Sequence, residues 1–362
     1  MKGTGESNLR VAVAGAGAFG RNHLRVYREL ETNGAGVVLA AAVEPDADRA
    51  AAAADKYGTP VFSTVDELLG AGLKLDAATV AVPTVHHHVV ASALLNAGLD
   101  LLVEKPLAAT LAEADDLLEL AARRKCILQP GHLERFNPAV LAVQPQLRRP
   151  MFFEAHRLSV FTPRALDVDV VLDLMIHDLD IVLTFANSPV REVRAVGLPI
   201  LSPRVDIANV RVEFESGCVA NFTASRVSTE RVRKLRFFEP RRYVSIDYAR
   251  RDLLVIRLDG SVPPEIAAAI AEGRMDPAAL AQLAAAGTGP GPGLSFVKPT
   301  VTQGEPLRLE VESFLDSVRT RREPRVTARQ GRDALALALE IQAKMAAHAV
   351  RAGLQNFFEP GA

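Results

Sequence analysis

The sequence has no tryptophan, four tyrosines and two cysteines among its 362 residues. The cysteines, Cys126 and Cys218, are far apart and lack the spacing of a metal site, so we expect free thiols in a reducing compartment. Few stacking aromatics argue against a nucleic-acid platform. A formal net charge of −1 gives no electrostatic reason to expect nucleic acid or an anionic membrane as partner.

Long apolar runs are also missing. No run approaches the ~20 residues that span a bilayer, and residues 1–10 lack the apolar core of a signal peptide. We therefore expect a soluble, cytoplasmic protein without membrane partners. Hydrophobic residues nevertheless make up 49% of the chain, enough for a substantial core, and the length favours two domains.

A glycine-rich stretch near the N-terminus is the most informative motif. The apolar run 11–14 leads into a loop with glycines at Gly15, Gly17 and Gly20, and helical spacing follows over 21–29. This order is typical of a dinucleotide site: the first glycine allows a tight turn, the second lets a pyrophosphate approach the backbone, and the third lets the helix pack close to the strand.

A second strand, predicted over 37–43, ends in Glu44. An acidic residue there accepts hydrogen bonds from both ribose hydroxyls. A 2′-phosphate beside Glu44 would be repelled, and neither Pro45 nor Asp46 can bind one, so we predict NAD in preference to NADP. Arg49 is the one nearby base that would weaken this preference.

Residues 10–131 alternate between predicted strands and helices, which indicates a parallel, doubly wound sheet. Ligands of such sheets bind beyond the carboxyl ends of the strands. The cofactor-binding candidates at these ends are Gly15, Gly17, Ala18, Phe19, Gly20, Glu44, Pro83, Thr84, His87, Glu104 and Lys105.

The pattern changes after residue 131, where strand-like runs follow one another without helical spacers and indicate a mostly antiparallel sheet. We expect domains over 1–131 and 132–362, a flexible excursion at about 259–295, and helices over 307–319 and 330–352 that close the second domain. A sheet face without helices suggests self-association, as a homodimer or homotetramer.

Asp173 and His177 are four residues apart in a predicted helix over 170–185, so they share one face. A carboxylate beside an imidazole fixes the tautomer and strengthens the base. A solvated polar face is the alternative, but the neighbouring residues are apolar nearly all round.

Lys105 ends a predicted strand, where its amine can polarise a substrate oxygen. Taken alone, Glu-Lys-Pro is more often a surface turn, and a cis bond at Pro106 would fix the lysine backbone. The histidines at 86–88 point in different directions without an accompanying cluster, so no metal site is expected. Side chains suited to an anionic or hydroxyl-rich substrate are Arg135, Asn137, Arg157 and Arg164.

Together these motifs resemble the glucose–fructose oxidoreductase/inositol dehydrogenase (Gfo/Idh/MocA) family over nearly the whole chain. The resemblance implies a Rossmann domain, a second α/β domain with a large open sheet, a nicotinamide cofactor and oxidation or reduction of a sugar carbon. It implies a catalytic set of Lys105, Asp173 and His177, with His177 as the base; the lysine and histidine exchange roles within the family.

One departure narrows the resemblance. Many members carry glycines before the catalytic aspartate, whereas this chain has Asp167-Val168-Asp169 there. With the segment 131–138, this is similar to the UDP-N-acetylglucosamine 3-dehydrogenase branch, which implies oxidation of the sugar C3 hydroxyl for 3-amino-sugar (lipid A) synthesis. An inositol or free-sugar dehydrogenase, and a non-catalytic dinucleotide-binding sensor, remain the alternatives.

Overall fold

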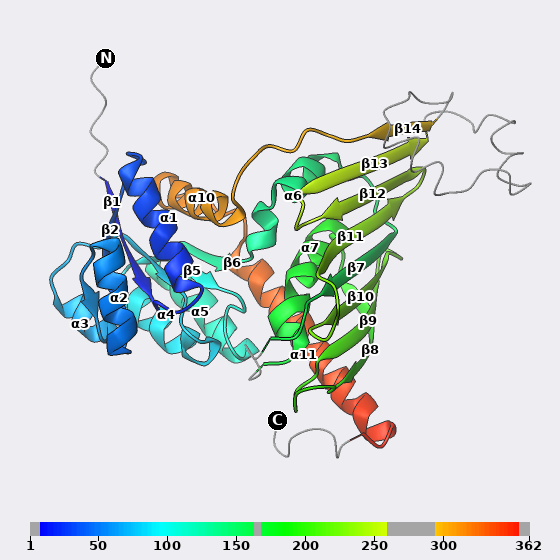
Figure 1. Cartoon of the computed structure of the whole chain (residues 1–362), viewed down its shortest axis with the longest axis horizontal. Helices are drawn as coiled ribbons and strands as arrows, with labels where there is room; N and C mark the ends of the chain where they lie inside the picture. The colour runs from blue at the N-terminus through cyan, green and yellow to red at the C-terminus, as the bar shows by residue number, and fades with distance from the viewer. Residues whose placement is uncertain (1–7, 163–167, 259–293, 355–362) are drawn as a thin grey trace, which may run out of the picture. The chain divides into compact units, whose positions relative to one another are not determined.

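The computed structural model describes residues 8–162, 168–258 and 294–354. The described residues form two compact units, each built on its own sheet (Figure 1). The first unit combines the chain up to Phe136 with a returning segment, Gly304–Glu340. The second unit comprises the chain between these parts and the chain from Ile341 onward. The predicted class, α/β with a parallel sheet and a second sheet domain, is confirmed.

The first unit contains a six-stranded sheet in the order β3-β2-β1-β4-β5-β6, with every pairing parallel. Its strands are β1 (Leu9–Ala14), β2 (Val37–Val43), β3 (Val61–Phe62), β4 (Ala77–Val80), β5 (Asp100–Glu104) and β6 (Leu128–Gly131). The strand order reverses between β1 and β4, which is where ligands of doubly wound sheets bind.

The helices between these strands begin and end at signals visible in the sequence. They are α1 (Gly20–Thr32), α2 (Ala47–Tyr57), α3 (Val65–Gly70), α4 (His87–Asn96) and α5 (Leu111–Arg124), with 3₁₀ turns η1 (Thr84–His86) and η2 (Leu133–Phe136). Thr64 caps α3 by accepting from the Glu67 amide at 3.1 Å. Thr110 and Glu113 form a complete capping box at α5, and Gly58 ends α2 in a left-handed conformation.

Helix α10 (Pro306–Thr320) belongs to the first unit, which corrects two expectations. From the sequence, residues 132–362 were expected to form one domain, and this helix was expected to close it. Instead its apolar stripe packs into the same core cluster as α1 and β2. The stripe residues are Val311, Phe314, Leu315 and Val318, against Leu24, Tyr27 and Leu30 of α1. Helix α11 (Ala328–Arg351) begins in the first unit and ends in the second.

The second unit contains an eight-stranded sheet in the order β14-β13-β12-β11-β7-β10-β9-β8. Its strands are β7 (Phe152–Leu158), β8 (Val190–Leu198), β9 (Ile207–Phe214), β10 (Val219–Ser225), β11 (Val232–Glu239), β12 (Arg242–Asp247), β13 (Asp252–Leu258) and β14 (Leu294–Val297). All pairings are antiparallel except that of β7 with β10. The predicted mostly antiparallel sheet is therefore confirmed.

Strand β14 was not predicted, because a flexible excursion was expected at about 259–295. Its residues Leu294–Val297 pair with β13 and extend the sheet by one strand. The rest of that interval, residues 259–293, lies outside the described residues.

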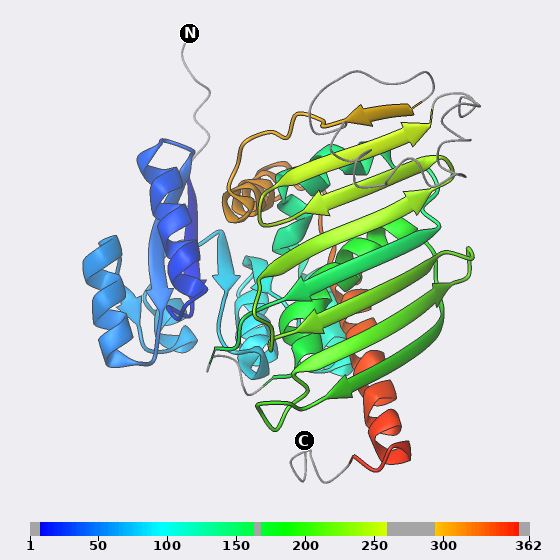
Figure 2. The same cartoon turned by 45° about the vertical axis from the view of Figure 1, so that its right-hand side comes forward.

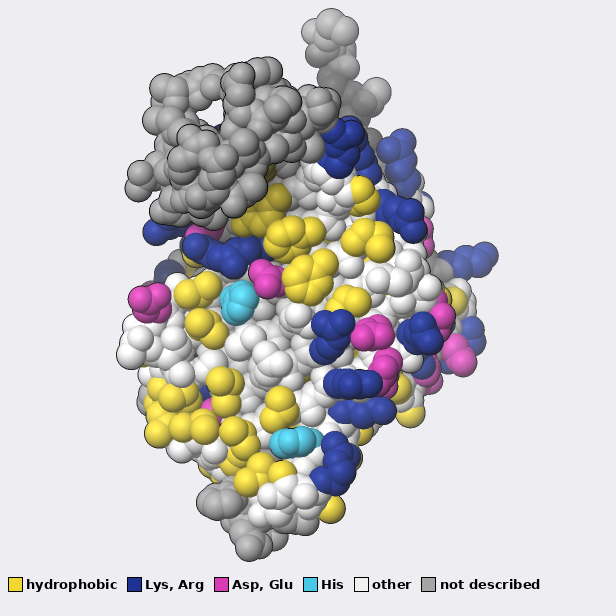
Figure 3. Space-filling model, turned by 90° about the vertical axis from the view of Figure 1, so that its right-hand side faces the viewer, with side chains coloured by type: hydrophobic (Ala, Val, Ile, Leu, Met, Phe, Trp, Pro, Cys, Tyr) yellow, Lys and Arg dark blue, Asp and Glu magenta, His cyan; other side chains and the backbone are white. Residues whose placement is uncertain are grey.

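The two faces of the second sheet differ. Helices α6 (Pro138–Val143) and α7 (Ile176–Ala186) lie over one face, as Figure 2 shows. The other face, seen in Figure 3, mixes hydrophobic and charged side chains. Along β7, buried residues such as Phe153 and Ala155 alternate with half-buried ones such as Phe152 and Glu154, as expected for a strand with one covered face. Within the described ranges, no helix is long and apolar enough to cross a membrane.

Candidate functional site

The glycine-rich loop lies between β1 and α1, at the carboxyl edge of the parallel sheet. Gly15 has φ +96°, and a Cβ there would lie 2.6 Å from the Ala81 carbonyl oxygen. A Cβ on Gly20 would overlap the Gly15 carbonyl. Gly17 differs, because no atom lies within 4 Å of its Cβ position. The first and third glycines thus serve the turn and the helix packing, while the second leaves an open backbone face beside the exposed Ala18 and Phe19.

Glu44 lies just after β2 and turns its carboxylate toward this loop. One oxygen accepts from the Ala16 amide at 2.9 Å, and the other accepts from the Asp46 amide at 3.1 Å and from Arg49 Nη2 at 2.9 Å. Burial opposes ionisation, but the hydrogen bonds from Arg49 and the two amides outweigh it and hold the pKa of Glu44 below its ordinary value. Glu44 therefore carries a negative charge at the loop.

Glu104 is the last residue of β5, and Lys105 follows it, next to a cis peptide bond between Lys105 and Pro106. The Glu104 carboxylate accepts a hydrogen bond from Nε2 of His23, a fully buried residue of α1, at 2.7 Å. Burial opposes ionisation of Glu104, but this hydrogen bond and the Lys105 charge lower its pKa. The backbone that carries Lys105 is thereby tied to the helix that follows the glycine loop.

His87, the cofactor candidate after β4, is buried. Its Nδ1 lies 2.8 Å from the Pro106 carbonyl oxygen and its Nε2 lies 2.9 Å from that of Val82. Burial lowers the pKa of His87, which favours a neutral ring. His87 thus joins the loops that follow β4 and β5. Pro83 is exposed and Thr84 half-buried at the start of η1, beside these loops.

The other two histidines of the run have separate surroundings, since His86 is exposed and His88 pairs with Asp116 at 2.7 Å. Among the residues that the structure describes, no three metal-ligating side chains gather into one group.

Asp173 and His177 lie in the second unit, on either side of a change in helix type. Asp173 is in a single π-helical turn, η4 (Val171–Met175), and His177 is in the first turn of α7. Both side chains are half-buried, whereas Met175 and Ile176 between them are buried. The predicted helix is confirmed but is not uniform. Isolated π turns are frequent at functional sites.

Arg157 is fully engaged inside the second unit. Its Nε and Nη2 donate to the two oxygens of Asp178 at 2.7 and 3.0 Å, and the guanidinium lies 5.2 Å from the centre of the Tyr248 ring. Arg157 and Asp178 are 3% and 2% exposed. This predicted substrate residue therefore anchors α7, one position after His177, and does not face solvent.

Of the three remaining substrate candidates, two form hydrogen bonds inside the fold and the third lies outside the described residues. Asn137 caps α6 through the Ala139 amide and donates to the Tyr248 carbonyl oxygen at 3.1 Å. Arg135 is 2% exposed and donates to the Arg325 carbonyl oxygen at 3.4 Å. Arg164 lies outside the described residues.

Comparison with known proteins identifies the family. Residues 9–132 match the family model described as "Oxidoreductase family, NAD-binding Rossmann fold", and residues 139–239 match the Gfo/Idh/MocA C-terminal domain. The chain belongs to the Gfo/Idh/MocA oxidoreductase family. It is accordingly a dehydrogenase that acts on CH–OH donors and uses a nicotinamide dinucleotide.

Several relatives resemble this Gfo/Idh/MocA member. The UDP-N-acetylglucosamine 3-dehydrogenase of Acidithiobacillus ferrooxidans is 32% identical over 92% of this chain and 96% of its own length. A solved structure of that enzyme superposes with a TM-score of 0.81, covering 94% of this chain and 99% of that one at 31% identity. Inositol 2-dehydrogenase of Leifsonia xyli is 34% identical over 51% of this chain and 56% of its own length.

The residues of the glycine loop fit the family's dinucleotide. The open face at Gly17 leaves room for a pyrophosphate against the backbone, and the α1 N-terminus follows at once. The Glu44 carboxylate is ionised and lies beside the loop, where it accepts from the Ala16 amide, and this is where the family's ribose-binding acid is expected.

Sequence reasoning missed two residues that organise these elements. His23 was not considered as a site residue, although its place three residues after Gly20 turns it toward the sheet, where it meets Glu104. Asp178 was not considered, although it binds Arg157 next to His177. The detectable signal in both cases was a single polar residue on an otherwise apolar helix face.

Proposed function

We propose that this dehydrogenase oxidises the C3 hydroxyl of UDP-N-acetylglucosamine to a ketone, with NAD as the oxidant. The similarity to the A. ferrooxidans enzyme carries the proposal, since it spans 92% of this chain and 96% of that enzyme. Similarity restricted to the dinucleotide domain would support the cofactor alone. Here it also includes the unit that carries Asp173 and His177.

The proposed chemistry uses three side chains. NAD, when bound, would supply the hydride acceptor. His177 takes the proton from the hydroxyl as the C–H bond breaks and the carbonyl forms, and the Asp173 carboxylate holds the imidazole in the tautomer that accepts it. Lys105 polarises the same oxygen through its ammonium group. Proton and hydride thus leave the same carbon for different acceptors.

Two features support NAD over NADP. The Glu44 carboxylate is 4% exposed and ionised, so a 2′-phosphate beside it would meet an unfavourable negative charge. Arg49, the nearby cation, is paired with Glu44 at 2.9 Å and so is not free to take a phosphate without breaking that bond. We expect a higher kcat/KM with NAD, and a clear NADP preference would refute this.

A second candidate substrate is inositol or another free sugar. The match to inositol 2-dehydrogenase favours it, although that match covers only half of this chain. A non-catalytic dinucleotide sensor is the third possibility, but a sensor does not need Lys105, Asp173 and His177 together.

The experiment mixes the purified protein with NAD and, separately, UDP-N-acetylglucosamine, myo-inositol and glucose, and follows absorbance at 340 nm. We expect NADH with the nucleotide sugar. NADH with inositol or glucose alone would favour the second candidate, and tight NAD binding without turnover of any substrate would favour the sensor.

The biological setting follows from the proposed product. A 3-keto nucleotide sugar is the substrate that an aminotransferase needs to make a 3-amino sugar, so we propose a role in lipid A synthesis, in the cytoplasm. For assembly we propose a homodimer or homotetramer. The uncovered sheet face supports it, because Phe152, Phe238 and Tyr243 cluster there with ring centres 5.6 and 5.2 Å apart. Light scattering in solution tests this.

A further inference from the structure

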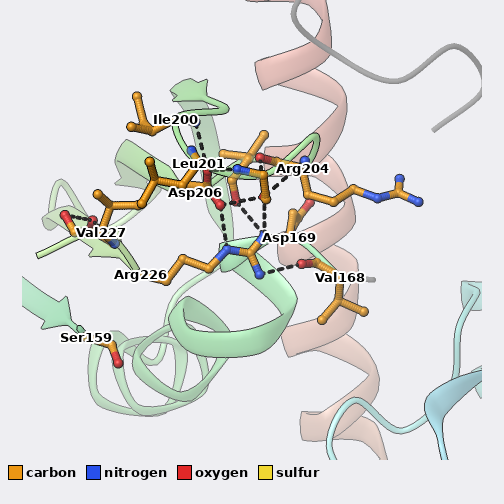
Figure 4. A network of polar contacts seen from close by, with 12 residues as sticks. Ser159, Val168, Asp169, Ile200, Leu201, Arg204, Asp206, Arg226 and Val227 are labelled. Atoms are coloured by element: carbon orange, nitrogen blue, oxygen red, sulfur yellow. Dashed lines mark hydrogen bonds and ion pairs between the residues drawn. The ribbon is translucent and has the colours of Figure 1, made fainter. Parts of the chain in front are cut away.

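A buried polar network lies next to the segment that leads into the π turn (Figure 4). Asp206, at the end of the β8–β9 loop, is its centre and is fully buried. One oxygen accepts from the amides of residues 200–202 at 2.6–2.8 Å. The other accepts from the Ser202 hydroxyl at 2.6 Å and from Arg226 Nε at 2.7 Å. The carboxylate is therefore saturated and the loop is fixed around it.

Arg226 carries the network to the chain that precedes Asp173. The residue is 4% exposed and follows β10 directly. While Nε binds Asp206, Nη1 donates to the carbonyl oxygen of Val168 at 2.9 Å. Two residues later, the amide of Val170 donates to the Val205 carbonyl oxygen at 3.0 Å. The backbone of 168–170 is thus held from two sides.

Asp169, between these two anchored residues, lies two residues before the π turn. Its Oδ1 accepts from the amides of Val171 and Leu172 at 2.9 and 3.1 Å, and its backbone carbonyl accepts from the Asp173 amide at 3.0 Å. Its Oδ2 accepts from Gln342 of α11. A single hydrogen bond therefore joins Asp173 to the backbone segment 168–170 that Arg226 holds.

We propose that Asp206 and Arg226 are positioning residues that set the π turn and, through it, the place of Asp173 and His177. The expected loss of catalysis rests on the proposed function, whereas the expected effect on the π turn does not. The contact with Val168 requires a side chain with donors in two directions. Lysine keeps the charge beside Asp206 but cannot also reach Val168, so Arg226→Lys separates the ion pair from the positioning contact.

The chain offers a matched control in Arg242. This arginine is also buried in the second sheet, pairs with Glu239 at 2.8 Å and donates to a backbone carbonyl, that of Gln146, at 2.6 Å. Its network ends on the segment after α6 and does not include the π turn. Arg242→Lys therefore reproduces the loss of a buried guanidinium without disturbing residues 168–173.

The experiment measures amide hydrogen exchange of the full-length variants and their steady-state kinetics. In Arg226→Lys we expect faster exchange over residues 168–178 and a kcat about 10- to 100-fold lower, because small displacements of catalytic groups cost this much. KM for NAD should stay within about twofold, since the dinucleotide loop is in the other unit. Arg242→Lys should leave both the exchange of 168–178 and kcat unchanged.

Unchanged exchange over 168–178 in Arg226→Lys, or an equal loss of kcat in Arg242→Lys, would overturn the proposal. If Arg226→Lys does not fold, Ser202→Ala decides, since it removes one hydroxyl from the network; we expect faster exchange over 168–178 and a kcat about three- to tenfold lower. If the wild type does not oxidise UDP-N-acetylglucosamine, the proposed function fails, while the exchange comparison still accepts or rejects the positioning role.

Discussion

Alanine substitutions at Gly17 and Gly20 should affect stability differently, and Gly17→Ala should also weaken cofactor binding. At Gly17 a Cβ meets nothing within 4 Å, whereas at Gly20 it overlaps the Gly15 carbonyl. Gly17→Ala should therefore fold as well as wild type, or gain ~0.4–1 kcal/mol because alanine restricts the unfolded chain. Gly20→Ala forces the helix from the strand and should cost about 1–3 kcal/mol.

With NAD present, Gly17→Ala should be less stable than wild type, because the added methyl group weakens NAD binding and so reduces the stabilisation that NAD provides. A ligand at 100 times its Kd stabilises the folded state by about 2.7 kcal/mol, and at ten times its Kd by about 1.4 kcal/mol. If the added methyl weakens binding tenfold, the NAD-dependent rise in Tm should shrink by about 2 °C for a chain of 362 residues. Thermal unfolding of both variants, with and without NAD, measures these effects.

The result that would refute this reasoning is a Gly17→Ala protein with the full wild-type NAD shift, because the open backbone face would then not be where the dinucleotide lies. A Gly20→Ala protein as stable as wild type would contradict the packing argument independently. Both variants add the same methyl group within one loop, so each is the other's control.

Three further predictions concern single side chains. His177→Asn should lower kcat by about 10²–10⁴-fold while leaving the NAD-dependent Tm shift unchanged; near-normal turnover at neutral pH would contradict its role as base. Burial opposes ionisation of Asp206, but hydrogen bonds from Ser202 and the loop amides hold its pKa at about 2, below the ordinary value of 3.8. The ionised carboxylate therefore contributes fully to stability above pH 3.8, and this contribution disappears as the pH falls toward 2. Asp206→Asn should therefore be less stable at neutral pH and lose less stability over that acid range, and parallel unfolding curves would refute this. Arg49→Ala should raise the pKa of Glu44 and strengthen the discrimination against NADP, measured as the ratio of the two kcat/KM values; a shift toward NADP would show that Glu44 does not repel the 2′-phosphate.

The parallel sheet could be predicted because its signals are local. Strands such as Val37–Val43 are short apolar runs bounded by turn residues, and each prediction placed the next polar residue, such as Glu44, at the sheet's carboxyl edge. The antiparallel sheet could be predicted from another local signal, the alternation of apolar and polar residues in strands such as Val219–Ser225 and Arg242–Asp247.

Features that depend on tertiary partners could not be predicted. The stripe of α10 shows that this helix is buried on one side, but not that α1 is the surface it covers. An arginine such as Arg157 is equally suited to a diphosphate or to a buried carboxylate, and only the fold places it against Asp178. The π turn that holds Asp173 adds no residue type that distinguishes it from an ordinary helix.

The most direct test of the central claim uses UDP-N-acetylglucosamine carrying deuterium at C3. If hydride leaves that carbon, mass spectrometry should find the deuterium in the reduced cofactor and a ketone at C3 of the sugar. Reduced cofactor without deuterium, or no reduction at all with this substrate while NAD binds normally, would contradict the assignment.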